Sequence, residues 1–142
     1  MIDPLEAAVK FLLGRAELSS LGNRISSKHR YGEQWTTADP AQASLVIVLD
    51  DSDPDLYVQK HDIRLEVSSY AGDDATAMDT WMTLVGLSRT VERTVVATSK
   101  GNALVYSFKP ESGPSYLPDK ELDMLKRVMS FWRIQVSEVP IT

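Results

Sequence analysis

Apolar residues near the start of the chain recur at helical spacing. Asp3 is a good N-cap, Pro4 suits the first helical position, and Glu6 stands three residues after Asp3, as in a capping box. Gly14 is a suitable residue to end the helix. The spacing therefore predicts a helix that begins after Asp3 and buries one face, formed by Leu5, Ala8, Val9 and Leu12.

Two segments further along have the pattern of strands. Residues 44–49 (SLVIVL) are an unbroken apolar run, so both faces should be covered, or one should meet a partner. Residues 61–70 alternate between apolar and polar positions, which predicts a half-buried strand with a charged outer face. The acidic segment 50–55 lies between them, and we expect it to be the loop of a hairpin.

A second helix is predicted from Gly72-Asp73-Asp74 to Arg93. Acidic residues open it, and Arg89 and Arg93 close it, so both ends complement the helix dipole. We expect its apolar face to lie on a sheet. That face comprises Ala75, Met78, Trp81, Met82 and Val85, widened by Leu84, Leu87 and Val91.

The last third of the chain predicts further strands. Residues 94–98 fit either a short strand or a helix exit, and the pattern does not decide between them. Residues 103–108 predict a strand with Leu104, Tyr106 and Phe108 on one face. Residues 126–138 predict another, with Val128, Trp132, Ile134 and Val136 on one face and Met129, Phe131, Arg133 and Gln135 on the other.

Together these elements predict an α+β fold with an antiparallel sheet of about four strands and two main helices packed on one face. The length of 142 residues suits a single domain spanning residues 1–142. The net charge of −5 argues against sequence-independent binding to a nucleic-acid backbone. There is no cysteine, and neither a signal peptide nor a membrane-spanning run is recognised, so we expect folding in a cytoplasm.

The sequence offers little reactive chemistry. The chain has two histidines, His29 and His61, but it contains no Gly-x-Ser-x-Gly motif that would supply an activated serine. No catalytic residue, cofactor or metal site is predicted. Asp51, Asp53 and Asp55 match positions 1, 3 and 5 of a calcium-binding loop, but Leu56 replaces its glycine. A solvated turn is therefore favoured over a calcium site. An enzyme whose carboxylates meet only in three dimensions stays an alternative.

The candidate functional residues are instead those that could form an interface or line a pore. Trp35 lies in an irregular polar segment, 26–42, where it covers either the core or a partner. Met129 and Phe131 are apolar residues on the second face of the last strand. The full set of candidates is Trp35, Asp50, Asp51, Asp53, Asp55, Met129 and Phe131.

The order of elements resembles a known family. The segments that carry the resemblance are 60–67 (KHDIRLEV), the helix start 72–79 (GDDATAMD), the turn Pro110-Glu111-Ser112-Gly113 and the closing strand 127–136 (RVMSFWRIQV). Over residues 4–136 the chain is similar to the tail terminator, or tail completion, proteins of long-tailed bacteriophages. Residues 50–55 and 115–125 depart from that pattern, and neck or head–tail joining proteins are close rivals.

The resemblance implies a structural, non-enzymatic protein of the virion, assembled in the cytoplasm of the bacterial host. The family forms a homo-hexameric ring that caps the tail tube, ends its polymerisation and offers a surface to the head. Its partners would be the tail tube protein, a head–tail connector protein and DNA that crosses the ring without specific binding, with no membrane. Six copies at −5 each would carry −30. A small acidic binding module or chaperone is the alternative from another class.

Overall fold

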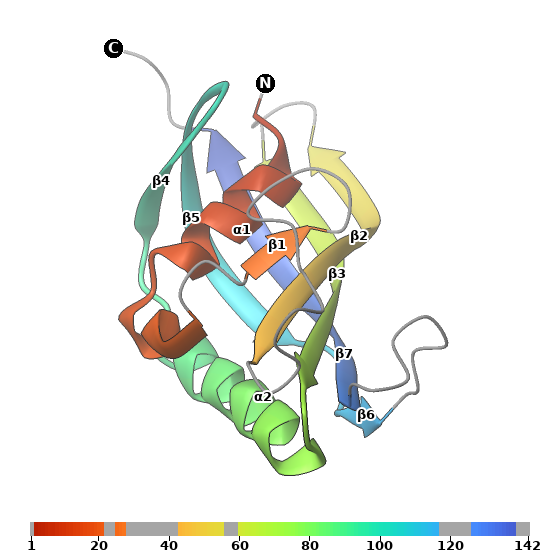
Figure 1. Cartoon of the computed structure of the whole chain (residues 1–142). Helices are drawn as coiled ribbons and strands as arrows, with labels where there is room; N and C mark the ends of the chain where they lie inside the picture. Colours follow the sequence, from red (N-terminus) through yellow and green to blue (C-terminus); the bar gives the residue numbers. More distant parts are fainter. Residues whose placement is uncertain (1, 22–24, 28–42, 56–59, 117–125, 139–142) are drawn as a thin grey trace.

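A curled β-sheet dominates the computed structural model, which describes residues 2–21, 25–27, 43–55, 60–116 and 126–138 (Figure 1). Its strands follow the order β1-β2-β3-β7-β5-β4, and β6 pairs with β7 beside this path. The helices are α1 (Pro4–Leu13), the 3₁₀ helix η1 (Ala16–Leu21) and α2 (Asp74–Ser88). The strands are β1 (Ile25–Ser27), β2 (Ser44–Asp55), β3 (Lys60–Ala71), β4 (Thr94–Thr98), β5 (Gly101–Pro110), β6 (Ser115–Tyr116) and β7 (Lys126–Glu138).

The predicted antiparallel sheet of about four strands in an α+β fold is wrong. The described part of the chain is mostly β, and its sheet is mixed, because β1 runs parallel to β2. Two of the strands carry weak sequence signals. The β1 strand has only three residues, and β4 follows α2 so closely that its pattern also fits a helix exit. The predicted hairpin of β2 and β3 is confirmed.

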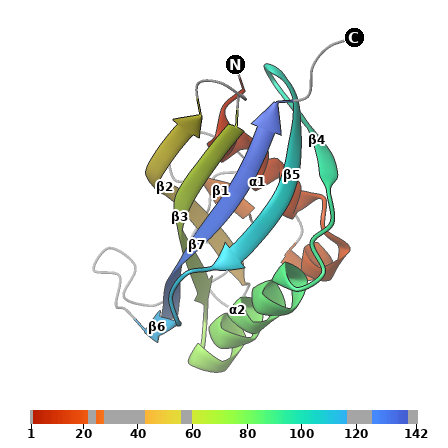
Figure 2. The same ribbon diagram turned by 180° about the vertical axis from the view of Figure 1, so that it is seen from behind.

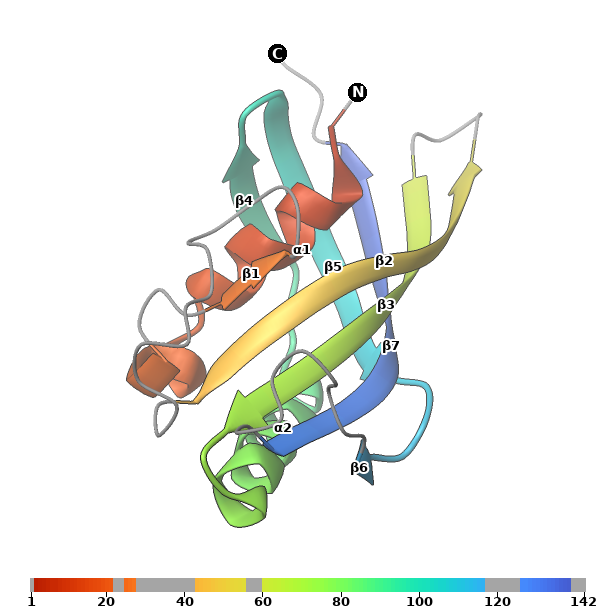
Figure 3. The ribbon, with the colours of Figure 1, turned by 45° about the vertical axis from the view of Figure 1, so that its right-hand side comes forward.

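The two long central strands, β3 and β7, pair along their whole length. Every second residue of β7 from Val128 to Val136 is buried, so its predicted inner face is confirmed. Figure 3 shows how the sheet curls around α1, which lies against its inner face. The core contains a chain of rings, in which Phe108 stacks on Trp132 at 4.6 Å between centroids and Phe11 of α1 lies 6.1 Å from Phe108.

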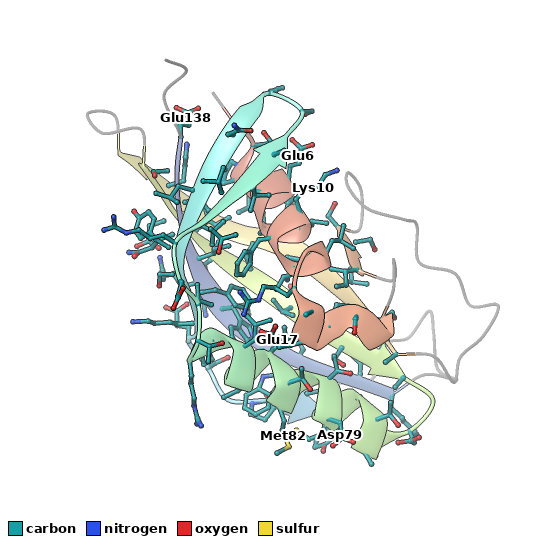
Figure 4. All side chains as sticks on the ribbon, turned by 90° about the vertical axis from the view of Figure 1, so that its left-hand side faces the viewer. Glu6, Lys10, Glu17, Asp79, Met82 and Glu138 are labelled. Carbon is teal, nitrogen blue, oxygen red and sulfur yellow. The ribbon has the colours of Figure 1, made fainter. Side chains whose placement is uncertain are left out.

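The first helix has the predicted ends. The Asp3 side chain accepts a hydrogen bond from the Leu5 N–H at 2.9 Å, and Gly14 is the C-cap residue. Glu6 is buried at 4% exposure and accepts hydrogen bonds from the N–H of Ser99 at 3.0 Å and from its hydroxyl at 2.9 Å. This carboxylate therefore ties α1 to the β4–β5 turn (Figure 4).

The second helix buries its predicted face only in part: Leu84 and Leu87 are buried as expected, but Ala77 and Thr80 replace Ala75 and Met82. Ala77, Thr80, Leu84 and Leu87 are buried, whereas Ala75 is exposed and Met82 is 59% exposed (Figure 4). The small Ala77 side chain packs with Ala71 and Val128, and the Ser69 hydroxyl donates to the Ala77 carbonyl at 2.9 Å. This close approach to the sheet fixes the rotation of the helix.

The predicted face of β5 is also wrong. The register with β7 shifts between Val105 and Ser107, so one extra residue enters β5. A bulge of this kind changes which residues face the core. As a result Ala103, Val105 and Phe108 are buried, while Leu104 and Tyr106 are only partly so.

The acidic segment 50–55 is not a loop. It continues β2, and its register partners in β3 run from Arg64 to Lys60. An extended strand of this kind does not have the turned backbone of a calcium-binding loop.

Candidate interaction surface

The outer face of the central strands carries alternating charged and apolar side chains. Figure 2 views the molecule from this side, where β3, β7 and β5 run across the front. Alternation along a strand sends every second side chain outward. The register then places Asp62 beside Gln135, Arg64 beside Arg133, and Glu66 beside Phe131.

Glu111 joins two arginines that lie directly opposite each other. One carboxylate oxygen lies 3.0 Å from Nε of Arg64, and the other lies 3.3 Å from the Arg133 guanidinium. Like charges that face each other across strands are destabilising, so the carboxylate between them offsets their repulsion. The turn that holds Glu111 is fixed by its own backbone, because the Glu111 N–H donates to the Phe131 carbonyl at 2.8 Å.

Two further ion pairs extend this arrangement along the strands. Arg133 contacts Asp62 at 3.2 Å, and this hydrogen bond, followed by the contact with Glu111, raises the pKa of Arg133 above its usual value. Arg127 contacts Glu66 at 2.7 Å. We call these residues the outer-face cluster: Asp62, Arg64, Glu66, Glu111, Arg127 and Arg133. Its three carboxylates and three guanidinium groups balance, so the cluster itself carries no net charge.

An apolar strip lies beside the outer-face cluster. The Arg64 guanidinium stacks 4.1 Å from the centre of the Phe131 ring. Met129 is two residues before Phe131 on the same strand, and its register partner in β6 is Ser115. Tyr116 is 55% exposed, but it pairs with the buried Val128 and so belongs to the opposite face of the sheet. We call Met129 and Phe131, which lie beside Ser115 of β6, the β6–β7 patch. Aromatic residues, methionine and arginine are the types enriched at protein interfaces.

The described residues show no arrangement that suggests catalysis. His61 is buried at the end of β3, with Pro54 and Val136 as its register partners. Within the described ranges, no three His, Asp or Glu side chains come together in a way that would hold a metal ion. In that part of the chain, no helix is long and apolar enough to cross a membrane.

The sequence-predicted candidates fall in separate places. Met129 and Phe131 lie together on β7 and belong to the β6–β7 patch. Asp50, Asp51, Asp53 and Asp55 belong to β2, on the other side of β3. Trp35 lies outside the described residues.

Sequence reasoning missed the outer-face cluster as a unit. The alternation in β3 predicts that Asp62, Arg64 and Glu66 face outward, and the alternation in the last strand places Arg133 on its second face. Nothing in the sequence shows that Glu111, from a turn expected only to reverse the chain, would lie between Arg64 and Arg133.

Comparison with known proteins gives a similarity of fold and no similarity of sequence family. No protein-family model matches the chain, and no curated protein sequence matches it. Among solved structures, it is similar to a chain from the virion of a native gene transfer agent (GTA) particle. The TM-score is 0.50 at 15% sequence identity, and the match covers 92% of both chains.

Proposed function

We propose that this chain is a structural protein of a phage-like virion, and that it serves there as the tail terminator. The observation that carries the proposal is the fold shared with a chain of the gene transfer agent virion over nearly the whole length of both. The order of elements from residue 4 to residue 136, which resembles tail terminator proteins, supports the finer assignment. In this role the protein closes the tail tube and offers a surface to the head.

The β6–β7 patch is the surface best suited to join neighbouring subunits of a ring. A closed ring needs a heterologous interface, in which one patch meets a different surface of the next subunit. Met129 and Phe131 lie on the outer face of β7, and the Phe131 ring lies beneath the guanidinium of Arg64. A desolvated aromatic centre with charged residues at its rim is the usual anatomy of a specific interface.

Electron microscopy of the chain mixed with tail tube protein tests this role. We expect rings at the tube ends, and tubes that stop growing once the chain is added. Met129→Lys and Phe131→Lys should abolish the rings, because each places a charge in the patch. Met82→Lys is the matched control, since Met82 is exposed on α2, which packs on the inner face of the sheet.

Other outcomes of the same experiment identify the rival functions. Tubes that grow without limit beside rings that join heads to finished tails would indicate a neck or head–tail joining protein. Particles that stay monomeric or dimeric and bind a peptide client would indicate a binding module. Turnover of a small substrate by the purified chain would indicate an enzyme, and any of these results would overturn the proposal.

The acidic stretch Asp50–Asp55 would suit the lumen of such a ring. Carboxylates repel DNA phosphates, so DNA would slide through instead of being retained. Replacing Asp51, Asp53 and Asp55 with lysine should make the ring bind duplex DNA, with an affinity that falls steeply as salt rises. Fluorescence anisotropy at increasing salt measures this. A lysine variant that retains no DNA would show that this stretch lies away from the DNA path.

A further inference from the structure

In the part of the chain that the structure describes, β4 forms one edge of the sheet, and no strand pairs with its outer side. Its sequence, Thr-Val-Val-Ala-Thr, contains no charge and no proline, and Val95 is 59% exposed. Figure 1 shows β4 at the margin of the molecule, with only β5 beside it in the sheet. An uncharged, exposed edge strand is a template for pairing with another strand.

The strand at the opposite edge of the sheet, β1, is not accessible for pairing with another strand. All three residues of β1 are buried, with Ser27 the most exposed at 7%. A strand from another molecule therefore has access to β4 and not to β1. The pairing of β4 of one copy with β1 of the next is excluded by this burial.

The turn after β4 determines which backbone groups face the open edge. Thr98 and Gly101 are register partners across a two-residue turn, and the Thr98 hydroxyl donates to the Gly101 carbonyl at 2.6 Å. Hydrogen-bonded and non-bonded pairs alternate along an antiparallel ladder. Counting back from Thr98, the N–H and C=O groups of Val95 and Ala97 point away from β5.

We propose that β4 pairs with β4 of a second copy of this chain, antiparallel, about a two-fold axis at Val96. This register makes Val95 the hydrogen-bonded partner of the partner's Ala97, and the two-fold axis repeats the pair, which gives four backbone hydrogen bonds. It also sets Thr94 opposite the partner's Thr98. Thr–Thr pairs and small apolar pairs are favourable across strands. The sequence of β4 is thus nearly self-complementary.

Charges on either side of the strand favour the same register. With Val96 at the axis, Glu92 lies opposite the partner's Lys100, and the two-fold repeats this pair. Both residues are exposed in the single chain. A shift of the register by two residues would separate these opposite charges. Charge complementarity therefore selects a second copy in this register as the occupant of the edge.

The inference is independent of the proposed function. Contacts within one cyclic ring are heterologous, whereas a two-fold contact is isologous. The β4 dimer therefore describes the chain outside such a ring, and rings on tail tubes neither require nor exclude it. A strand pair of this length buries less surface than a standard stable interface, so we expect dimerisation to depend on concentration.

Sedimentation equilibrium of charge-swap variants tests the register. Glu92→Lys and Lys100→Glu each turn two attractive pairs into repulsive ones, and each should weaken the dimer by roughly tenfold. The double variant restores opposite charges and should return to within about threefold of the original affinity. Asp79→Lys is the control, because Asp79 is exposed on α2, and it should leave dimerisation unchanged.

Two further variants test the backbone pairing. Val95→Pro removes an N–H that points to the open edge, a position where an edge strand tolerates proline, and should give a folded monomer. Val96→Cys places two thiols at a non-hydrogen-bonded pair in a chain without other cysteines, so mild oxidation should give a covalent dimer. Thr83→Cys on α2 should give none. A chain that is monomeric at every concentration, or a dimer unaffected by Val95→Pro and by both charge reversals, would overturn the proposal.

Discussion

Ser130 holds two indole rings at once. Its hydroxyl oxygen accepts a hydrogen bond from Nε1 of Trp132 at 2.6 Å and another from Nε1 of Trp81 at 2.8 Å. These bonds connect the buried face of β7 to α2. A single oxygen atom thus satisfies two donors, one of which is fully buried.

Replacing Ser130 with alanine should therefore cost more stability than its small volume suggests. Two indole N–H groups lose their acceptor, and each unsatisfied buried donor costs about 1–3 kcal/mol. We expect the free energy of unfolding to fall by about 2–3 kcal/mol in urea titrations, with a change in tryptophan fluorescence. Ser115→Ala, at an exposed position, should stay within about 0.5 kcal/mol. Equal losses in both variants would contradict the shared role of the hydroxyl.

At the scale of the element, the bulge in β5 reverses an expectation drawn from alternation. Strict alternation buries Leu104 and exposes Val105, whereas the structure buries Val105 completely. Val105→Ala should lower the free energy of unfolding by about 2 kcal/mol, because it removes buried methyl groups and leaves a cavity. Leu104→Ala, although it removes a larger side chain, should cost less. Thermal unfolding of the two variants measures this, and a larger loss for Leu104→Ala would mean that β5 has no bulge.

The start of α2 gives a pH-dependent prediction. The N–H of Thr76 donates to the Asp73 carboxylate at 2.7 Å, and this contact lowers the pKa of Asp73 below its usual value of 3.8. A lowered pKa in the folded state stabilises the fold above pH 3.8, and that contribution is lost as the pH falls through the folded-state pKa.

Asp73→Ala should therefore be less stable than the original chain at neutral pH, and the gap should narrow as the pH falls below about 4. Asp73→Asn keeps an acceptor for the helix N-terminus and should lose less than the alanine variant. Urea unfolding followed by circular dichroism across pH 2–7 measures both differences. A gap that is the same at every pH would show that the charge of Asp73 plays no part.

The elements differ in how far the sequence determines them. The capped helix α1 and the strand β7 were predicted because caps and strict alternation are local signals. The buried face of α2 was predicted only in part, because its rotation depends on the close approach of Ala77 to Val128, which lies far along the chain. The strand β1 was missed for a similar reason, since three residues become a strand only through their pairing with β2.

At the scale of the whole molecule, the interaction surface was predictable only in part. Met129 and Phe131 could be placed on the second face of β7 from alternation alone. The ion pairs around them need the register between β3 and β7 and the position of Glu111, which come from tertiary structure. The sequence thus indicates the face of a strand, whereas the fold assembles the surface.

The net charge of the chain predicts how salt affects formation of the proposed ring. In the proposed ring, six copies at −5 each would bring together a charge of −30, so repulsion between subunits would oppose closure at low salt. Raising the salt from about 0.1 M to about 1 M shortens the screening length from about 10 Å to about 3 Å. Ring formation, measured by sedimentation velocity with tail tube protein present, should therefore increase with salt.

The same change should act on the β4 contact through its two Glu92–Lys100 pairs. Screening weakens the attraction between Glu92 and Lys100 in the original chain, and it weakens the repulsion between the facing lysines in Glu92→Lys. Added salt should therefore increase dimerisation more in Glu92→Lys than in the original chain. Sedimentation at increasing salt can then distinguish ring formation from dimerisation through β4. A ring that dissociates as salt rises would mean that ion pairs hold its subunits together, and the apolar β6–β7 patch would lose its assigned role.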